Sequence, residues 1–283
     1  MIKGIILDID GVIVGEKIGY NSPYPHPDVI ARLKSIEAKG IPVSLCTAKP
    51  YYAIRKIIDD ANLHNLHITE GGAVIIDPID NSVLKSHAID KAVAKLVVQS
   101  YIDAGVYVEV YALNNYMIDK SQQSELTRTH THILQQDPQI VESLADAMDK
   151  QAVFKIMPIA VDENDKTRLE AVFKPYENEL TLSWGVHRIA LPHQFGIITN
   201  KGISKHQAVL EISDHSDLDP ADMLGIGDST SDWQFIEPCG YAATLENATA
   251  ELKQLVKTKG DKACIGGHVD KNGVLAIFDY FGL

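Results

Sequence analysis

The sequence predicts an α/β fold in which a doubly wound parallel sheet is interrupted by an inserted α+β module. Two observations predict the sheet: short apolar runs alternate with helical patterns over residues 1–82, and the same alternation resumes after residue 199. A third observation predicts the insert, because in residues 83–198 the order changes to helix, strand, strand. We therefore expect two domains, a core of residues 1–82 and 199–283 and an insert of residues 83–198.

The core elements follow from apolar spacing. Residues 2–7 are continuously apolar and rich in isoleucine, as expected for a strand buried on both faces. Val29, Leu33 and Ile36 share one helical face in a helix that we expect to end at Gly40. The remaining core elements are predicted by the same patterns: strands at 41–45, 68, 74–76 and 223–226, and helices at 51–61, 204–212 and 233–236.

The insert has a different order of elements. It is predicted to contain helices at 88–104, 139–149 and 163–175, and strands at 106–112, 116–119 and 153–161. A polar stretch over residues 121–136 leads into the second helix, and residues 180–186 and 188–191 are predicted to form a hairpin. This order favours an antiparallel sheet covered on one face by helices.

Composition excludes several classes of protein. Of 283 residues, 45% are hydrophobic and 23% charged, which is typical of a globular protein with a full core. No apolar run reaches the roughly 18 residues of a membrane-spanning helix, and the first eight residues do not resemble a signal peptide. A net charge of −12 without a basic stripe argues against nucleic acid as a partner. Three cysteines without metal-ligand spacing suit a reducing cytoplasm.

The first chemically informative motif directly follows the first strand. Asp8 and Asp10 lie two residues apart, so their carboxylates can face the same side of an extended chain, and Gly11 permits a sharp turn. A carboxylate can attack phosphorus when a cation neutralises the phosphoryl oxygens. The second carboxylate can protonate the leaving group and later activate water. A turn with two solvated acids is the alternative, and a calcium loop is disfavoured because the fifth position is Val12.

Two further motifs follow predicted strands. Thr47 ends the second strand, where its hydroxyl can donate to a phosphoryl oxygen or simply cap a turn. Asp228 and Asp232 come after the strand at 223–226. Asp228 fits as a magnesium ligand beside Asp8, and Asp232 fits as a ligand or as a residue that orients one. A helix cap would explain one of these two acids but not both.

Two lysines lie close to the start of the helix at 204–212, namely Lys201 and Lys205. A cation at a helix N-terminus opposes the helix dipole, and a nearby acidic cluster that holds a phosphate would compensate that cost. An ordinary surface position is the alternative for either lysine. Because the carboxyl ends of parallel strands meet at one edge of a sheet, all of these motifs can converge there.

Taken together, the motifs resemble the haloacid dehalogenase superfamily. Their order is DxDG, a strand-end threonine, a lysine before a helix, and GDxxxD. The place of the insert, between the second and third motifs, is similar to that in Cof-type sugar phosphatases and archaeal phosphoglycolate phosphatase. The segment from Thr69 to Ala73 resembles the family's TENGA loop, and Lys271 to Val274 matches the segment that closes this domain. The resemblance implies a Rossmann-like catalytic core with a substrate-specificity cap.

Carried over residue by residue, the resemblance implies a magnesium-dependent phosphatase. Asp8 would be the nucleophile, and Asp10 the general acid and base. Magnesium would be held by Asp8, Asp228 and the backbone carbonyl of Asp10, with Asp232 at the same metal site. Lys205 matches the family lysine better than Lys201, since it stands immediately before the helix. The phosphoryl group would be bound by Thr47, Ala48, Gly71, Gly72 and Lys205.

The resemblance implies a small phosphorylated metabolite as partner, and neither nucleic acid nor a membrane. Four positions depart from the family pattern, and none of them removes a catalytic group: Val12, Lys49, Gly71 and Ser231. The changes at Gly71 and Ser231 concern details of metal and substrate binding. An acid at Asp10 favours hydrolysis of a phosphate monoester over dehalogenation. A phosphomutase is the first alternative and is disfavoured by the lack of a dense basic cluster in the insert. A non-catalytic sensor is the second, and it would not need both Asp8 and Asp10.

Histidines of the insert allow two interpretations. His130 and His132 suggest a metal site, but without an acid or cysteine at ligand spacing a solvated polar face is the favoured interpretation. Arg128, this pair of histidines and the residues 187, 188 and 193 are candidate substrate contacts. The sequence does not identify the substrate or the oligomeric state.

Overall fold

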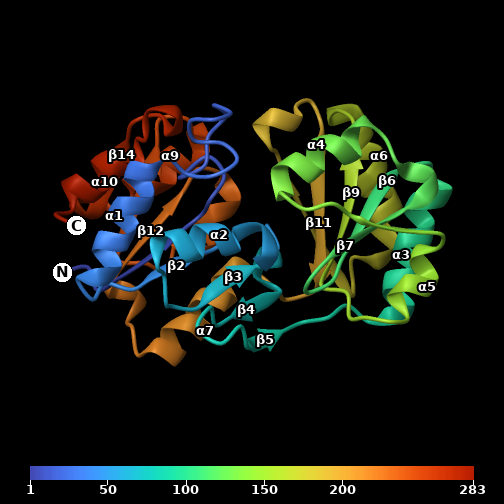
Figure 1. The fold of residues 1–283 in the computed structure, drawn as a ribbon, viewed down its shortest axis with the longest axis horizontal. Helices are drawn as coiled ribbons and strands as arrows, with labels where there is room; N and C mark the ends of the chain where they lie inside the picture. The colour runs from blue at the N-terminus through green and yellow to red at the C-terminus, as the bar shows by residue number, and fades with distance from the viewer. The chain divides into compact units, whose positions relative to one another are not determined.

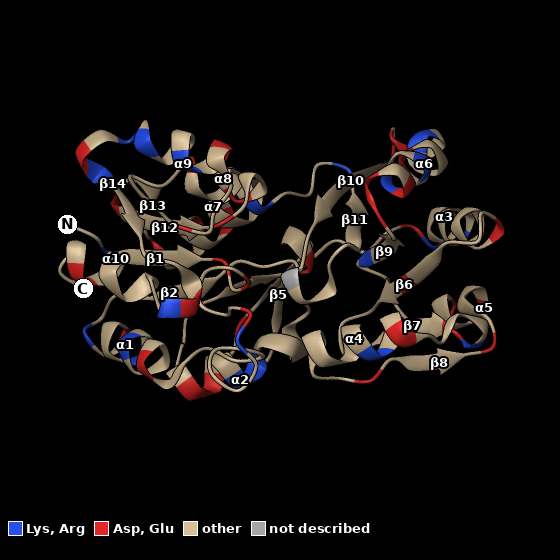
Figure 2. Cartoon of the chain, turned by 90° about the horizontal axis from the view of Figure 1, so that it is seen from above, with Lys and Arg blue, Asp and Glu red and all other residues tan. Residues whose placement is uncertain are grey.

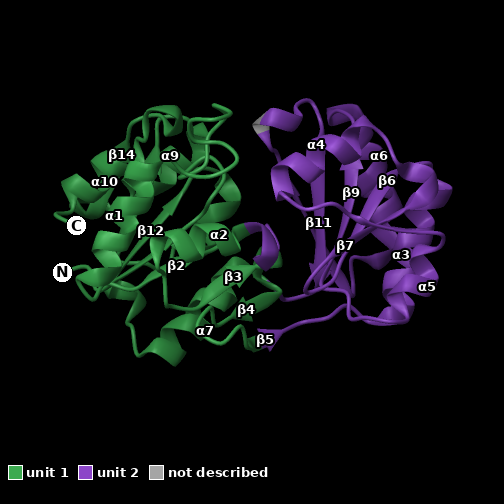
Figure 3. Cartoon of the chain, in the orientation of Figure 1, with its two compact units in different colours: residues 1–47, 54–84, 204–283 green, residues 48–53, 85–203 purple. Residues whose placement is uncertain are grey.

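The computed structural model describes residues 1–283, except for the side chain of Arg188. Contacts divide the chain into two compact units (Figure 3). The first unit comprises residues 1–47, 54–84 and 204–283, and the second comprises residues 48–53 and 85–203. In Figure 1 the first unit combines blue elements from the N-terminus with orange and red elements from the C-terminus. The predicted fold class, a core interrupted by an α+β insert, is confirmed. Unlike the predicted division, the contacts count residues 48–53 with the insert.

The first unit is built on a parallel sheet in the order β14-β13-β12-β1-β2. In this sheet β1 (Gly4–Leu7) pairs with β12 (Met223–Gly227) on one side and with β2 (Val43–Leu45) on the other. The outer strands are β13 (Tyr241–Leu245) and β14 (Ala263–Gly266). All four residues of β1 are buried, as expected for a strand with neighbours on both edges and helices on both faces.

Helices cover both faces of this sheet (Figure 2). On one face lie α7 (Lys205–Ser216), α8 (Trp233–Ile236) and α9 (Ala250–Lys257). On the other face α1 (Pro27–Ala38) and α10 (Val274–Tyr280) pack against each other. The helix after β2 is α2 (Tyr51–Ala61). The sheet is therefore doubly wound, as predicted.

A small sheet in the order β3-β4-β5 adjoins β2. Its strands are β3 (His67–Thr69), β4 (Val74–Ile76) and β5 (Val83–Ser86), and β3 pairs antiparallel with β4. An isolated parallel bridge joins Cys46, the residue after β2, to Ile68 of β3. The bridge brings the end of β2 beside the loop between β3 and β4.

The second unit contains a mixed sheet in the order β10-β11-β9-β6-β7-β8. Its strands are β6 (Tyr107–Tyr111), β7 (Tyr116–Asp119), β8 (Gln139–Val141), β9 (Lys155–Ala160), β10 (Leu180–Gly185) and β11 (Gln194–Asn200). The strand pairs are antiparallel except for β7 and β8. Val108 and Val110 of β6 belong to one apolar cluster and Tyr111 to another, so both faces of this sheet are buried.

Four helices complete the described part of this unit: α3 (Lys91–Asp103), α4 (Glu125–Leu134), α5 (Leu144–Met148) and α6 (Glu163–Phe173). Residues of α3, α5 and α6 share the apolar cluster that contains Val108, whereas Ile133 and Leu134 of α4 belong to the cluster that contains Tyr111. The prediction that helices cover one face was therefore wrong, since α4 packs on the second face. Among the described helices of both units, none has the length and apolar composition needed to cross a bilayer.

Three local predictions in the insert were wrong. The predicted helix at 139–149 is divided into β8 and α5, because Gln139–Val141 pairs with β7. The second hairpin strand is β11 (Gln194–Asn200), whereas residues 188–190 form a 3-10 turn. The polar stretch at 121–136 contains α4. Its inward positions 126, 130, 133 and 134 have helical spacing, but one of them is a histidine.

The interpretation of His130 as part of a solvated face was also wrong. Only 4% of His130 is exposed, and its Nδ1 lies 2.7 Å from Oε2 of the fully buried Glu109. Glu109 is far from His130 in the sequence, so no local spacing could have indicated this pair. His132, on the same helix, is partly buried.

We predict that Ile6→Ala destabilises the protein by about 2–5 kcal/mol, because Ile6 is fully buried in the inner strand β1 and its truncation leaves a cavity. Urea unfolding measures the change. Ile79→Ala is the matched control: Ile79 is 70% exposed, so its truncation is expected to change stability by less than about 0.5 kcal/mol. Equal losses in the two variants would contradict the assigned burial.

Candidate active site

The acidic motif lies where β1 leaves the sheet. Asp8 is the first residue after β1, and its backbone N–H donates to the carbonyl of Ile226 in β12 at 3.0 Å. The side chain of Asp8 is 13% exposed. The chain then turns back on itself, since the N–H groups of Val12, Ile13 and Val14 all donate to the carbonyl of Ile9. This turn places Asp10 beside Asp8, at the carboxyl edge of the sheet.

Gly11 permits this turn for two reasons. Its φ is +78°, a conformation that disfavours residues with a Cβ. A Cβ at this position would also lie 1.9 Å from Oδ2 of Asp228. The backbone of the first motif therefore lies directly against the carboxylate of the last one.

Asn247 supports the same turn and was missed in the sequence. Its Nδ2 donates to the carbonyl of Gly11 at 2.8 Å, and its Oδ1 accepts from the N–H of Val269 at 2.9 Å. Asn247 follows β13, so a polar residue after another parallel strand was the available signal. Through this side chain the loops after β1, β13 and β14 are joined.

Lys205 forms the central ion pair of the site. It is the first residue of α7, where Ser204 caps the helix by accepting from the N–H of Gln207. Its Nζ donates to Oδ1 of Asp232 at 2.7 Å and lies 3.8 Å from Oδ1 of Asp8. Lys201 belongs to the second unit, where its Nζ donates to the carbonyl of Glu177. Of the two lysines considered near the start of this helix, it is therefore Lys205 that lies beside Asp8.

Both oxygens of Asp232 accept hydrogen bonds. While Oδ1 faces Lys205, Oδ2 accepts from the N–H groups of Asp228 and Ser229 and from the hydroxyl of Ser229, each at 3.0 Å. Asp232 is fully buried. Of the two roles predicted for it, metal ligand and orienting residue, these contacts favour the second.

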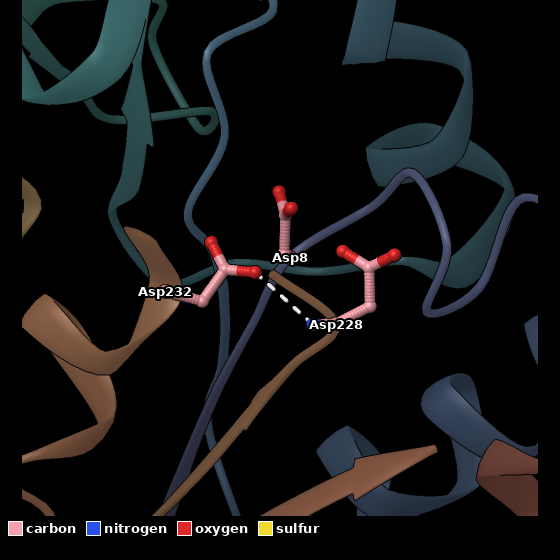
Figure 4. Close-up of side chains that lie close together, drawn as sticks. All are labelled: Asp8, Asp228 and Asp232. Carbon is pink, nitrogen blue, oxygen red and sulfur yellow. Dashed lines mark hydrogen bonds between the residues drawn. The ribbon is translucent and has the colours of Figure 1, made fainter. Parts of the chain in front are cut away.

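Three carboxylates converge at this edge of the sheet (Figure 4). Asp8, Asp228 and Asp232 each offer an oxygen, and these oxygens lie within 4.8 Å of one another. With Asp10 they make four acids beside the ammonium of Lys205. Hard oxygen donors with surplus negative charge are what Mg²⁺ prefers, so the residues present fit the predicted ion.

The charge imbalance appears in the pKa values. Burial raises the pKa of Asp8 to about 7, and the carboxylates of Asp232 and Asp10 add to the rise, while Lys205 opposes it. Burial lowers the pKa of Lys205, but Asp232 and Asp8 outweigh this effect and raise it above its usual value. Burial also raises the pKa of the Cys46 thiol, which disfavours its thiolate form.

The predicted phosphate-binding residues lie on two adjoining loops. Thr47 is 2% exposed, its N–H donates to the carbonyl of Ile68, and its own carbonyl accepts from the N–H of Gly71 at 3.1 Å. Gly72 has a φ of +108°, and a Cβ there would lie 2.8 Å from the backbone of Ser204. Because of this close approach, the loop of Gly71 and Gly72 lies against the start of α7, where Lys205 stands.

Ala48 is the remaining predicted phosphate-binding residue. It follows Thr47 but is counted with the second unit, where its carbonyl accepts from Nζ of Lys155 at 2.8 Å. Thr47 is counted with the first unit. The side chain of Arg188, a candidate substrate contact, lies outside the described residues.

Comparison with known proteins gives consistent matches along nearly the whole chain. A family model described as haloacid dehalogenase-like hydrolase matches residues 5–278. A phosphatase of 5-amino-6-(5-phospho-D-ribitylamino)uracil from Bacillus subtilis is 23% identical, over 98% of this chain and 97% of its own length. Phosphoglycolate phosphatase from Sulfolobus acidocaldarius is 24% identical, over 94% of each chain. A haloacid dehalogenase-like hydrolase from Bacteroides thetaiotaomicron has the same fold, with a TM-score of 0.83 and 15% identity over 99% of this chain and 100% of its own.

We expect Asp232→Asn to destabilise the protein by about 3–5 kcal/mol, because it removes the carboxylate that pairs with the buried Lys205 at 2.7 Å and leaves the ammonium only the more distant Asp8, at 3.8 Å. Asp222→Asn is the matched control, since Asp222 pairs with the exposed Lys3 and its loss is expected to cost at most about 1 kcal/mol. Chemical denaturation of both variants measures the difference. A cost for Asp232→Asn no greater than that for Asp222→Asn would contradict the structural role of the buried pair.

The raised pKa of Asp8 predicts a pH-dependent stability of the metal-free protein. The folded state holds this proton above the ordinary pKa of 3.8, so the stability contributed by Asp8 is complete below that value and is lost as the pH rises through about 7. In EDTA, Asp8→Asn removes the buried charge and is expected to exceed wild type in Tm by about 2–4 °C near pH 8, with a smaller gap near pH 5. Thermal unfolding across this range measures the gap, and a gap independent of pH would refute the assignment.

Proposed function

This chain belongs to the haloacid dehalogenase-like hydrolases, and we propose that it hydrolyses a small phosphate monoester through a phosphoryl intermediate on Asp8. The predicted enzyme class, a phosphatase, is confirmed by curated relatives that are named phosphatases. The observation that carries the mechanism is the position of Asp8, which follows β1 and faces Lys205 at 3.8 Å beside three further carboxylates.

In the first step an oxygen of Asp8 attacks phosphorus, and the bond from phosphorus to the leaving oxygen breaks. Asp10 donates its proton to this leaving oxygen. In the second step Asp10 accepts a proton from water, the water oxygen attacks phosphorus, and the bond to Asp8 breaks. Inorganic phosphate leaves, and both carboxyl groups return to their starting states.

Positive charge and hydrogen-bond donors stabilise the transferring group. Lys205 supplies a fixed ammonium, since Asp232 holds its Nζ in place, and Thr47 supplies a hydroxyl and needs no charge. Gly71, Gly72 and the backbone of Ala48 complete the predicted phosphate-binding loops. Asp8, Asp228 and the carbonyl of Asp10 are the residues that would hold Mg²⁺, which when bound neutralises the phosphoryl oxygens.

The substrate class we propose is a sugar phosphate or a short acid phosphate resembling phosphoglycolate. Two relatives support it by their names, since one acts on a phosphorylated ribityl compound and the other on phosphoglycolate. We place the enzyme in the cytoplasm, which agrees with its three free cysteines. No nucleic acid or membrane partner is proposed, and the insert is proposed as the substrate-specificity cap.

The proposal predicts phosphate release that needs Mg²⁺ and Asp8. Wild type, Asp8→Asn and Asp10→Asn would be assayed with an aryl phosphate and a panel of sugar and short acid phosphates, each with Mg²⁺ and with EDTA. We expect no turnover by Asp8→Asn or in EDTA, and a kcat reduced about 10²–10⁴-fold in Asp10→Asn. Asp222→Asn, at the surface pair with Lys3, is expected to match wild type.

Mass spectrometry of the peptide containing Asp8 separates the two steps. In Asp10→Asn we expect the mass of one phosphoryl group to accumulate on this peptide, because the second step lacks its base. Activity that survives Asp8→Asn would eliminate Asp8 as the nucleophile. Turnover that needs a bisphosphate and releases no phosphate would replace the phosphatase with a phosphomutase.

A further inference from the structure

Lys155 is a buried cation in the second unit that the proposed chemistry does not use. It is the first residue of β9, and only 1% of it is exposed. A buried ammonium is costly unless polar groups compensate it. Its compensating contacts therefore show which part of the chain it holds.

Two contacts of Lys155 stand out. Its Nζ donates to the carbonyl of Ala48 at 2.8 Å and lies 3.7 Å from the centre of the Tyr111 ring. The hydroxyl of Tyr111 donates to Oε2 of Glu109 at 2.6 Å, and this carboxylate also faces His130. A buried polar chain thus runs from α4 through β6 to the carbonyl of Ala48, and Glu109 supplies the negative charge across the aromatic ring.

The segment that follows Ala48 is packed in the same place. Residues 48–53 are counted with the second unit, and Ala53 belongs to the apolar cluster that contains Tyr111, Met157 and Phe195. Tyr52 packs against this cluster as well. The segment directly after Thr47 is therefore held at one end by Lys155 and at the other by an apolar core.

We propose that Lys155 is a positioning residue for the phosphate-binding loop. By holding the carbonyl of Ala48, it sets the plane of the peptide between Ala48 and Lys49, because the carbonyl and the following N–H of a trans peptide point in opposite directions. The direction of the Lys49 N–H and the path of the chain leaving Thr47 follow from that plane. This inference rests on the proposed function for its catalytic consequence, but the anchoring of residues 48–53 does not.

The test compares Lys155→Met, which keeps the length but loses the charge and donor, with Lys155→Arg, which keeps both. Lys155→Gln is a second variant that removes the charge, and it is used if Lys155→Met does not fold. Val97→Ala is the matched control, because Val97 is fully buried in the other apolar cluster of the same unit. Its loss of Tm reports general destabilisation of this unit alone.

Two readouts separate positioning from general stability. In Lys155→Met or Lys155→Gln we expect amide hydrogen exchange in the peptide covering residues 48–53 to accelerate about tenfold, and inhibition by inorganic phosphate to weaken about tenfold. Lys155→Arg should recover most of both, and Val97→Ala should change neither at an equal loss of Tm. We also expect a lower kcat in the disruptive variants, with a smaller change in the KM for the substrate.

Wild-type exchange and wild-type phosphate inhibition in a folded Lys155→Met or Lys155→Gln variant would overturn the proposal. Equal effects of Val97→Ala would also overturn it, because they would show that Lys155 acts through stability alone. A wild-type protein without phosphatase activity would instead refute the proposed function. Hydrogen exchange needs no turnover, so it would still decide whether Lys155 holds residues 48–53.

Discussion

The buried ion pair between Lys205 and Asp232 is the interaction on which the rest of the candidate site depends. Burying two charges is costly unless they pair with each other and form further hydrogen bonds. Asp232 pairs with Lys205 and also accepts a hydrogen bond from the N–H of Asp228. One of its oxygens holds the start of α7, and the other holds the backbone after β12. The same carboxylate therefore orients the ammonium that faces Asp8 and the loop that carries Asp228. Charges fixed in this way need no reorganisation when a phosphoryl group is transferred.

Close backbone approach is the second constraint. Parallel strands deliver their loops to one edge of the sheet, but only small residues let these loops touch. Gly11 meets the carboxylate of Asp228, and Gly72 meets the backbone of Ser204. Asn247 then joins the loops after three strands by accepting and donating once each. The result is a dense, buried group of acids. Burial first, and then repulsion by Asp232 and Asp10, raise the pKa of Asp8, and the surplus negative charge favours a divalent cation.

The second unit was the less predictable part. Apolar spacing located β6, β7 and β9, whereas α4 was missed because a buried histidine occupies one of its inward positions. Polar residues are normally assigned to the surface, and His130, Glu109 and Lys155 are exceptions whose burial depends on one another. Such mutual dependence links residues far apart in the chain, so no window of sequence reveals it. Residues 48–53 were assigned to the core because they lie between core elements in the sequence, whereas the contacts count them with the insert.

The sequence by itself determined the doubly wound core, the interruption by an insert, and the acids and lysine of the candidate site. It did so because strand and helix periods, and motifs at strand ends, depend on residues close together in the chain. Only the tertiary structure decided that Asp232 orients its neighbours, that Asn247 joins the loops, and that Lys155 holds Ala48. These roles depend on hydrogen bonds formed out of water between distant segments. A polar group is buried only where such hydrogen bonds compensate the cost of burial, and sequence patterns do not describe that cost.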